Sequence, residues 1–521
     1  MGWHLWRRIW SPRLKRRRRR NRAVVIVLAL LLAIGAAALV ANLNVVVAEA
    51  AFAAARANQT ELRNFLYRMP KGGDLHVHLS GGVYAERYIG WAADDDLFLL
   101  SCNMTIVKLP LDKPPAPPCD KADDFLPMKK VAQDQTLSDR VVNAMSMRDF
   151  VPTGAEPSGH DHFFAAFGKF GAVSGRHFDD MVVDQLAYYG DQSAQYVELM
   201  TSFSGFDERK QLVGAIAGKT DFAAKLEALT EAGLATFVEQ KKQELDKAVA
   251  EIEKKRDCNP QKVKPGCNVT YRFVAQVSRN SPPDDVFVQT AIAAALVRAD
   301  SRVVAFNYVQ VEDAAIARAD YHEQMRIVAY LAGNPPDEKR VNVTLHAGEL
   351  WLGLVPPDDL TFHIGEAVKV ALAQRIGHGV SLAFERDRDD LLAEMHRRNV
   401  AVEINLTSND MILGVRGNIH PFPAYRAAGV PVVLTTDDAG VERIDLTDEY
   451  VRAALDYRID YTALKALARA SLTYSFLEKA EKEAELARFD AASAEFERSV
   501  AARISLPQKL ALIARASAGW W

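Results

Sequence analysis

Eight short runs rich in apolar and β-branched residues recur along the chain, and several of them alternate with amphipathic stretches of helical character. Strands that alternate with helices are typical of parallel βαβ units. Eight such runs predict an α/β fold, a (β/α)8 barrel of the TIM type rather than an open sheet. In such barrels the reactive groups lie where strands end and the following loops begin. The runs cover residues 74–79, 195–203, 270–278, 303–311, 341–348, 374–380, 400–408 and 431–438.

The N-terminus carries the signals of export. Residues 1–22 are densely basic, and residues 23–43 contain no charged side chain. About 20 apolar residues can cross a bilayer as a helix, and the basic flank should then stay in the cytoplasm. A cleaved signal peptide is the alternative, because residues 47–50 have small side chains at the spacing of a cleavage site. In both cases the rest of the chain is expected outside the cytoplasm, either anchored and facing the periplasm or extracellular side, or secreted.

The four cysteines agree with export. Cys102 and Cys119 bracket a proline-rich loop, and Cys258 and Cys267 bracket a second short loop. Neither pair has CxxC spacing, and no histidine is close enough in sequence to suggest a zinc knuckle. Both pairs are therefore predicted to be disulfides of an oxidising compartment, with free buried thiols as the alternative.

The remaining sequence divides around the barrel, and its composition is that of an ordinary globular protein. Apolar residues make up 49% and the net charge is −3, so the bulk of the chain offers no argument for nucleic-acid binding. A proline-rich insertion and a charged helical insertion interrupt the barrel. The predicted parts are a linker helix at 44–67, the barrel at 68–480 with insertions at 94–135 and 219–268, and C-terminal helices at 481–521.

Polar residues suited to chemistry stand at the ends of four of the predicted strands. The segment GGDLHVHLSGG places two imidazoles on one face of a strand, because side chains alternate along it. In LHAGEL a glutamate follows three residues after a histidine that ends a strand, so both can face one cavity. RIGHGVSL adds a histidine, and LTTDDAG places two adjacent carboxylates at a strand end. The residues are His76, His78, His346, Glu349, His378, Asp437 and Asp438.

Three imidazoles and one carboxylate make a plausible divalent-metal site with an open position for water. Glu349 and His378 then remain for proton transfer, since a buried carboxyl beside a metal can hold its proton and act as a general acid. Each motif alone has a structural explanation: two core histidines, a helix-capping glutamate or a polar turn. The repetition of such motifs at successive strand ends favours a single site.

The motifs DLHVHL, HAGE, RIGHG and TTDD, in this order, resemble those of the adenosine deaminase family of zinc hydrolases, over roughly residues 66–480. MPKGGDLHVH, the early insertion and SLTYSFLEKA (471–480) are most similar to the secreted, growth-factor-related branch of that family. The resemblance implies that adenosine is hydrolysed to inosine and ammonia. It also implies that Zn²⁺ makes water nucleophilic, with His76, His78, His346 and Asp437 as its ligands.

The resemblance implies roles for three further residues. His378 would orient or deprotonate the water, Glu349 would protonate ring N1, and Asp438 would hold N7 of the purine. A related branch of the family dimerises through an N-terminal helical segment, so a homodimer is possible, although only about 25 residues separate the apolar segment from the barrel.

Two positions depart from the family pattern. Many members have an aspartate that contacts the ribose where this chain has Ser80. On the fourth strand they usually have a glycine whose backbone meets the purine, where this chain has Gln310. The segment 403–409 also lacks the usual Cys-Pro, and Ser408 and Asn409 are interpreted as loop-positioning groups. These departures affect the substrate rather than the metal chemistry.

Three functional hypotheses follow. The first is an exported aminohydrolase acting on adenosine or a close 6-aminopurine nucleoside. The second is another zinc amidohydrolase-type enzyme with a different amine or amide substrate, as Ser80 and Gln310 would allow. The third is a non-catalytic surface binding protein that keeps the barrel as a scaffold; the complete set of Glu349, His378 and both aspartates argues against it.

Overall fold

The computed structural model describes residues 43–511 apart from 112, 114–118, 155–157, 260, 262–263, 334–339, 506 and 510. The basic segment and nearly all of the apolar segment 23–43 lie outside these residues. Within the described part of the chain, no helix combines the length and apolar character needed to cross a membrane. Anchoring, signal cleavage and dimerisation therefore stay predictions from the sequence.

Eight parallel strands form two four-stranded sheets, and each strand overlaps one of the eight predicted runs; β1 and β5 begin one or two residues before theirs. The first sheet has the order β1-β5-β6-β7 and the second β11-β10-β9-β8. The predicted barrel of the TIM type is therefore confirmed. Its strands are β1 (Gly72–His78), β5 (Ala194–Thr201), β6 (Thr270–Ser278), β7 (Val303–Val309), β8 (Thr344–Ala347), β9 (Arg375–His378), β10 (Ala401–Ile404) and β11 (Val432–Leu434).

Single parallel bridges join the two sheets at both seams. Phe306 pairs with Val343 at one seam, and Val77 pairs with Asp437 at the other. Strand β11 ends at Leu434. The expectation that Asp437 and Asp438 stand on a strand end is therefore wrong in detail: both follow the strand, on a segment that pairs with β1 instead.

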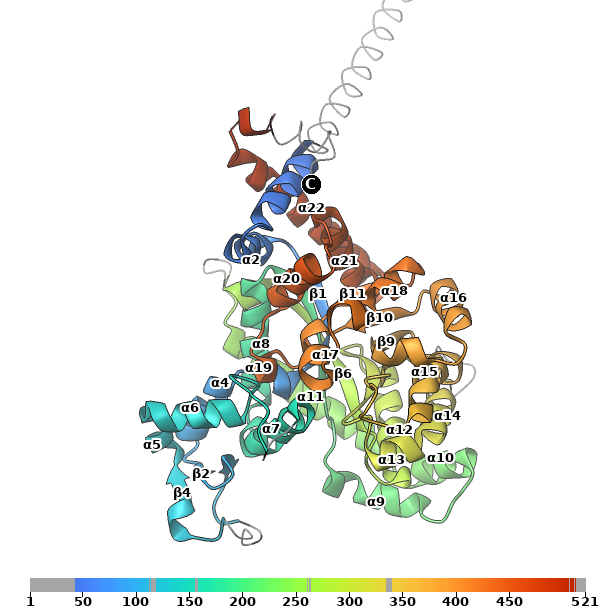
Figure 1. The fold of residues 1–521 in the computed structure, drawn as a ribbon. Helices are drawn as coiled ribbons and strands as arrows, with labels where there is room; N and C mark the ends of the chain where they lie inside the picture. The colour runs from blue at the N-terminus through green and yellow to red at the C-terminus, as the bar shows by residue number, and fades with distance from the viewer. Residues whose placement is uncertain are drawn as a thin grey trace, which may run out of the picture.

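Helices surround the barrel and extend beyond it (Figure 1). Helix α12 is buried on most of its sides, which explains its nearly continuous apolar sequence. The helices between and after the strands are α8 (Phe178–Asp191), α9 (Phe206–Ile216), α12 (Pro283–Ala299), α13 (Ala315–Ala319), α14 (Tyr321–Gly333), α15 (His363–Lys369), α16 (Arg388–Arg398), α17 (Leu406–Leu413), α18 (Phe422–Ala427), α19 (Ala439–Glu442), α20 (Leu446–Asp456), α21 (Tyr461–Thr473) and α22 (Lys479–Ala502).

The predicted linker helix is two helices. One covers residues 43–55, and the other is α2 (Gln59–Arg68). The side chain of Asn58 accepts hydrogen bonds from the backbone N–H groups of Thr60 and Glu61, so it starts α2 as an N-cap. At the top of Figure 1 the first of these helices lies beside α22.

Both insertions differ from their predicted form. The first contains a three-stranded antiparallel sheet of β2 (Phe98–Leu100), β3 (Thr105–Val107) and β4 (Phe125–Pro127). The strands are only three residues long, too short for a visible alternation of apolar and polar residues. The second insertion contains two helices, α10 (Phe222–Glu231) and α11 (Leu234–Arg256), because Gly233 between them has a φ of +96°.

Helices α3 (Leu79–Gly82), α4 (Ala85–Asp94), α5 (Met128–Gln133), α6 (Gln135–Ala144) and α7 (Gly159–Ser174) complete the region between β1 and β5. Two disulfides, Cys102–Cys119 and Cys258–Cys267, join the predicted pairs. Each closes the loop that its two cysteines bracket, so the prediction of both disulfides is confirmed.

Candidate metal centre and active site

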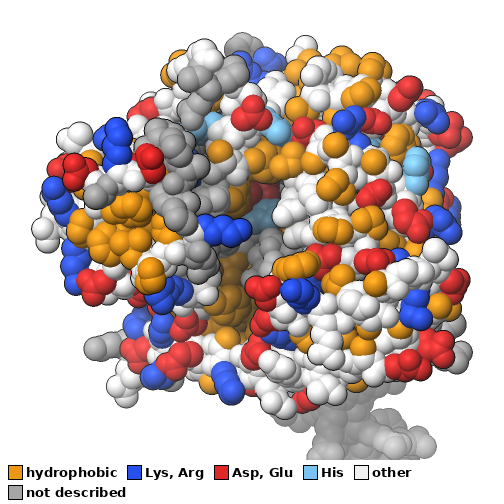
Figure 2. Space-filling model, turned by 90° about the horizontal axis from the view of Figure 1, so that it is seen from below, with side chains coloured by type: hydrophobic (Ala, Val, Ile, Leu, Met, Phe, Trp, Pro, Cys, Tyr) orange, Lys and Arg blue, Asp and Glu red, His pale blue; other side chains and the backbone are white. Residues whose placement is uncertain are grey.

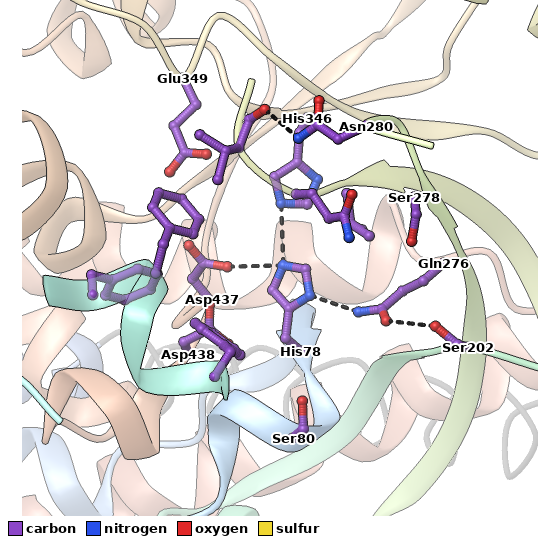
Figure 3. A pocket seen from close by; sticks show the side chains of 16 residues that line it. His78, Ser80, Ser202, Gln276, Ser278, Asn280, His346, Glu349, Asp437 and Asp438 are labelled. Atoms are coloured by element: carbon purple, nitrogen blue, oxygen red, sulfur yellow. Dashed lines mark hydrogen bonds and ion pairs between the residues drawn. The ribbon is translucent and has the colours of Figure 1, made fainter. Parts of the chain in front are cut away.

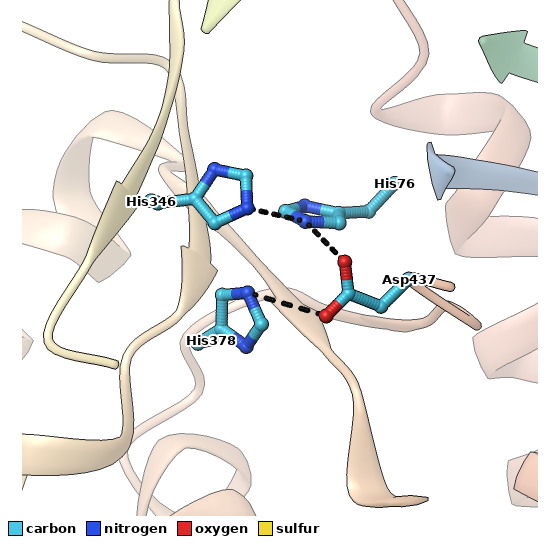
Figure 4. A group of neighbouring side chains, drawn as sticks. All are labelled: His76, His346, His378 and Asp437. Carbon is cyan, nitrogen blue, oxygen red and sulfur yellow. Dashed lines mark hydrogen bonds and ion pairs between the residues drawn. The ribbon is translucent and has the colours of Figure 1, made fainter. Parts of the chain in front are cut away.

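Four side chains from β1, β8 and the segment after β11 meet inside the mouth of the barrel. His346 Nε2 lies 3.1 Å from His76 Nε2 and 3.2 Å from His78 Nε2. Asp437 Oδ1 lies 3.4 Å from His76 Nε2 and 3.3 Å from His78 Nε2. The structure thus brings together all four residues that the sequence suggested as metal ligands (Figures 3 and 4).

The other ring nitrogen of each imidazole has a polar partner. His76 Nδ1 is 2.6 Å from Glu403 Oε2, and His346 Nδ1 is 3.0 Å from Asn307 Oδ1. His78 Nδ1 is 2.7 Å from the carboxamide of Gln276, whose oxygen and nitrogen can exchange places by rotation. Carboxylate and amide partners on Nδ1 fix the ring orientation and direct Nε2 toward a metal ion.

These residues fit a divalent metal. Asp437 Oδ1 is buried and has no hydrogen-bond donor among the described residues, although a buried carboxylate oxygen normally has a partner. A cation between it and the imidazoles would satisfy this oxygen. A set of imidazole nitrogens with one carboxylate suits zinc and its neighbours in the transition series.

His378 lies against the same cluster from β9. Its Nε2 is 3.7 Å from Asp437 Oδ2, and its Nδ1 is 3.6 Å from Glu349 Oε1. Ligand atoms of His76, His346, His378 and Asp437 all lie within 4.8 Å of one another (Figure 4). His378 is therefore close enough to act on a water molecule at the cluster, and close enough to compete with His78 as the third imidazole.

A buried ion-pair network lies behind His76. Glu403 accepts hydrogen bonds from Arg375 and from Thr344 Oγ1, and Arg375 also pairs with Glu198. Burial raises the pKa of Glu403, but the charge of Arg375 and the hydrogen bond from His76 outweigh it and lower the pKa to about 2. Glu403 is therefore a carboxylate at any working pH, and it can hold the Nδ1 proton of His76.

The Nδ1 partners Glu403, Asn307 and Gln276 are not among the site residues predicted from the sequence. One sequence feature does point to them: each is an isolated polar residue within an apolar, strand-like run, at positions 403, 307 and 276. Such a residue is expected to face the barrel interior and to need a partner there. The signal gives no indication of which histidine that partner is.

The acid predicted from HAGEL is buried at the side of the cluster. Glu349 is 7% exposed. Burial raises its pKa well above the usual range, and the charges of Asp437 and Glu312 add to this effect. A carboxyl group in this position keeps its proton near neutral pH, as a general acid must.

A cavity of about 510 Å³ opens onto the cluster. Figure 2 views the molecule from below relative to Figure 1 and shows a hollow near the centre, with histidine inside it. Glu349, Asp438, Ser80 and Gln310 all line the cavity. One wall is aromatic and comes from α7, whose phenylalanines are not among the site residues predicted from the sequence. No lysine or arginine is among the described lining residues, which also include His78, His346, Asp437, Phe163, Phe164, Phe167, Ser202, Gln276, Ser278, Asn280, Val309 and Val311.

The two residues interpreted as loop-positioning groups both contact the site. Ser408 Oγ donates to Asp437 Oδ2 at 2.9 Å, and Asn409 Nδ2 lies 2.9 Å from His378 Nδ1. Both side chains are fully buried on α17. They hold the carboxylate and the imidazole in fixed orientations.

Several residues at the site have left-handed backbone conformations, with φ of +79° at Gln310, +66° at His378 and +67° at Asp437. Non-glycine residues adopt this region at a cost, and such strain gathers at functional sites. At position 310 a glycine would adopt this backbone conformation without steric cost, whereas Gln310 adopts it with strain.

The fold and the cluster together define a metal-binding (β/α)8 barrel. Its sequence is matched over residues 226–492 by the model of the adenosine deaminase family. The chain belongs to this family.

Curated relatives match part of the chain. An adenosine deaminase of Enterococcus faecalis is 32% identical over 143 residues, which are 27% of this chain and 39% of that protein. An aminodeoxyfutalosine deaminase of Streptomyces coelicolor is 36% identical over 116 residues, 22% of this chain and 29% of that protein. The chain thus matches less than half the length of these relatives.

A solved structure shows the same fold over most of the chain. The N6-mAMP deaminase of Arabidopsis has a TM-score of 0.52 and 18% identity, and the match covers 82% of this chain and 99% of that one. At this identity the likeness shows the fold alone.

Replacing Glu403 by Gln is expected to weaken metal binding about 10- to 100-fold, because the partner of His76 Nδ1 loses its charge. Dialysis against graded chelator followed by metal analysis measures this change. Glu198→Gln is the matched control, since it disturbs the same arginine, Arg375, without touching a histidine. Equal losses in the two variants would contradict the role assigned to Glu403.

Proposed function

We propose that this protein is a zinc-dependent aminohydrolase that converts adenosine, or a close 6-aminopurine nucleoside, and water into inosine, or the matching product, and ammonia. The observation that carries the proposal is the convergence of three imidazoles and Asp437 beside the buried carboxyl group of Glu349. Membership of the adenosine deaminase family supports the same chemistry.

One set of site residues would bind the metal, and a further residue, His378, would accept a proton. His76, His78, His346 and Asp437 would hold the zinc ion. When bound, zinc supplies Lewis acidity that makes water nucleophilic near neutral pH. His378, fully buried and 3.7 Å from the Asp437 carboxylate, orients the attacking water and accepts its proton.

Two carboxyl groups of the pocket would bind the purine. Glu349 gives its proton to ring N1, which makes C6 electrophilic, and it can do so because burial keeps the carboxyl neutral. Asp438 lines the same cavity, and its buried Oδ1 has no partner among the described residues. Burial raises the pKa of Asp438 well above its usual range, so this carboxyl can keep a proton and donate it to N7 of the base, which is a hydrogen-bond acceptor.

The lining of the pocket favours an uncharged nucleoside over a nucleotide. The aromatic wall of α7 suits a purine ring. The hydroxyl and amide groups of Ser80, Ser202, Ser278 and Asn280 suit a sugar. Lysine and arginine are the usual partners of a phosphate, and neither is among the described lining residues. The Arabidopsis enzyme with the same fold is named for a nucleotide, N6-mAMP. The preference for a nucleoside in this protein therefore rests on the residues that line its own pocket.

Gln310 motivates the second candidate, a related aminohydrolase with a different amine substrate. It lines the cavity at the place where the family resemblance predicts bare backbone against the purine. A side chain here narrows or reshapes the purine site. The choice between the two candidates therefore depends on how the pocket behaves when this side chain is removed.

We also propose that the reaction takes place outside the cytoplasm. The disulfides Cys102–Cys119 and Cys258–Cys267 support an oxidising compartment. The basic and apolar N-terminal segments of the sequence support export to it.

Purified, zinc-loaded protein is expected to release ammonia from adenosine. Glu349→Gln should lower kcat about 100- to 10,000-fold because the proton donor is lost, while its zinc content stays that of the wild type. Ammonia release and metal analysis measure both effects. No release by the wild type from adenosine, deoxyadenosine or adenine would refute the purine assignment, and full activity of the variant would refute the role of Glu349.

Replacing Gln310 by Gly is expected to lower KM for adenosine severalfold and to stabilise the fold by roughly 1 kcal/mol through relief of the left-handed backbone. Steady-state kinetics and urea unfolding measure the two effects. The control is Leu372→Gly, at a residue that has φ of +54°, is 40% exposed and lies outside the pocket lining. It should leave KM unchanged. A higher KM in Gln310→Gly would instead show that the side chain binds the substrate.

A further inference from the structure

Glu312 is a buried carboxylate that the metal cluster and the proposed reaction leave without a role. It is 1% exposed and lies three residues after the end of β7. Oε1 accepts a hydrogen bond from the backbone N–H of Gly348 at 2.9 Å, and Oε2 accepts one from the N–H of Glu349 at 2.8 Å. The Glu312 side chain is therefore hydrogen-bonded to both residues of the turn that carries Glu349, the proposed proton donor.

This turn has the geometry that binds anions. Gly348 has φ of +76°, and a Cβ at this position would lie 2.7 Å from atoms of Ile364 and Ser381. Successive N–H groups that point to one side of such a left-handed turn form a concave site for a negative group. In this protein the negative group is the chain's own carboxylate.

Charges behind Glu312 keep it ionised. His363 Nδ1 is 2.6 Å from Oε1, and Arg279 Nη1 is 3.7 Å from the same oxygen. Burial raises the pKa of Glu312, but the hydrogen bond and charge of His363 and the charge of Arg279 outweigh it and lower the pKa to about 2. Glu312 thus accepts both N–H bonds throughout the working pH range.

We propose that Glu312 is a positioning residue that fixes the backbone at Gly348 and Glu349 so that the carboxyl group of Glu349 faces the substrate pocket. The inference rests on the proposed function, because it takes Glu349 to be the proton donor. Glu312 itself is absent from the pocket lining, so it acts only through the turn.

The effect should fall on the chemical step. A displacement of about 1 Å at a reacting group can lower the rate about 100-fold. The aromatic wall and Asp438, which would hold the base, come from other elements, α7 and the segment after β11. Loss of Glu312 should therefore lower kcat and leave KM nearly unchanged.

Glu312→Gln tests this directly, since the amide offers one acceptor and turns an NH₂ group toward the second N–H. We expect kcat for adenosine to fall about 10- to 100-fold, with KM within about threefold and zinc content equal to the wild type. If this variant yields no folded protein, Glu312→Asp replaces it. That variant keeps the charge but is too short to reach both N–H groups, and its kcat is expected to fall about tenfold.

Glu385→Gln is the matched control. Glu385 is 8% exposed and also accepts two successive backbone N–H bonds, from Ile364 at 2.7 Å and Gly365 at 3.2 Å. It makes no hydrogen bond to the turn at Gly348. The kcat of Glu385→Gln should stay within about twofold of the wild type. The thermal unfolding of this variant measures the loss of stability caused by neutralising a carboxylate that accepts two backbone N–H bonds. A kcat of Glu312→Gln or Glu312→Asp equal to that of Glu385→Gln would overturn the inference.

A double variant separates positioning from general damage. In a Glu349→Gln background the proton donor is already absent, so adding Glu312→Gln should change the residual kcat by less than about threefold. A further loss as large as in the wild-type background would overturn the inference. A wild type inactive on every aminopurine would instead refute the proposed function itself.

Discussion

Two backbone hydrogen bonds close the barrel at the place where its chemistry lies. The N–H of Asp437 donates to the carbonyl of His76 at 2.9 Å, and the N–H of His78 donates to the carbonyl of Asp437 at 3.0 Å. The last segment of the barrel thus pairs with the first through the residues that would bind the metal. Closure of the sheet at this seam therefore places Asp437 beside His76 and His78.

Hydrogen bonds and buried ion pairs around this seam orient the side chains of the site. The carboxylate of Asp74 accepts from Thr436 N at 3.1 Å and from Thr436 Oγ1 at 2.8 Å, which ties β1 to the segment that carries Asp437. Behind His76 the chain Glu403–Arg375–Glu198 is almost wholly excluded from water. Buried ion pairs add little net stability, because desolvation offsets their attraction. Their value here lies in fixed ring and carboxylate orientations.

The barrel and the cluster were predictable because they depend on short-range patterns. Each of the eight runs overlaps a strand, and residues at the carboxyl ends of parallel strands must share one mouth. The same reasoning placed His346 and Glu349 in one cavity. It failed for Asp437 and Asp438 in detail, because a β-branched run does not show that β11 stops at Leu434 and that the chain then pairs with β1.

The remaining features depend on contacts distant in sequence. The aromatic residues of α7 read as ordinary core residues, and only the packing of that helix over the mouth makes them a pocket wall. Glu312 lies in an unremarkable polar segment, and its role appears only when the turn at Gly348 lies beside it. The break between α10 and α11 has a different cause. It depends on Gly233, and a single glycine within a charged helical pattern does not by itself predict that the helix ends there.

The X-ray absorption spectrum of the zinc-loaded protein tests the central claim most directly, because scattering from imidazole rings counts the histidines bound to the ion. The wild type is expected to show three imidazoles, with His78→Asn losing one and His378→Asn keeping all three. An ion without imidazole ligands, or an imidazole lost from His378→Asn but not from His78→Asn, would contradict the assigned metal centre.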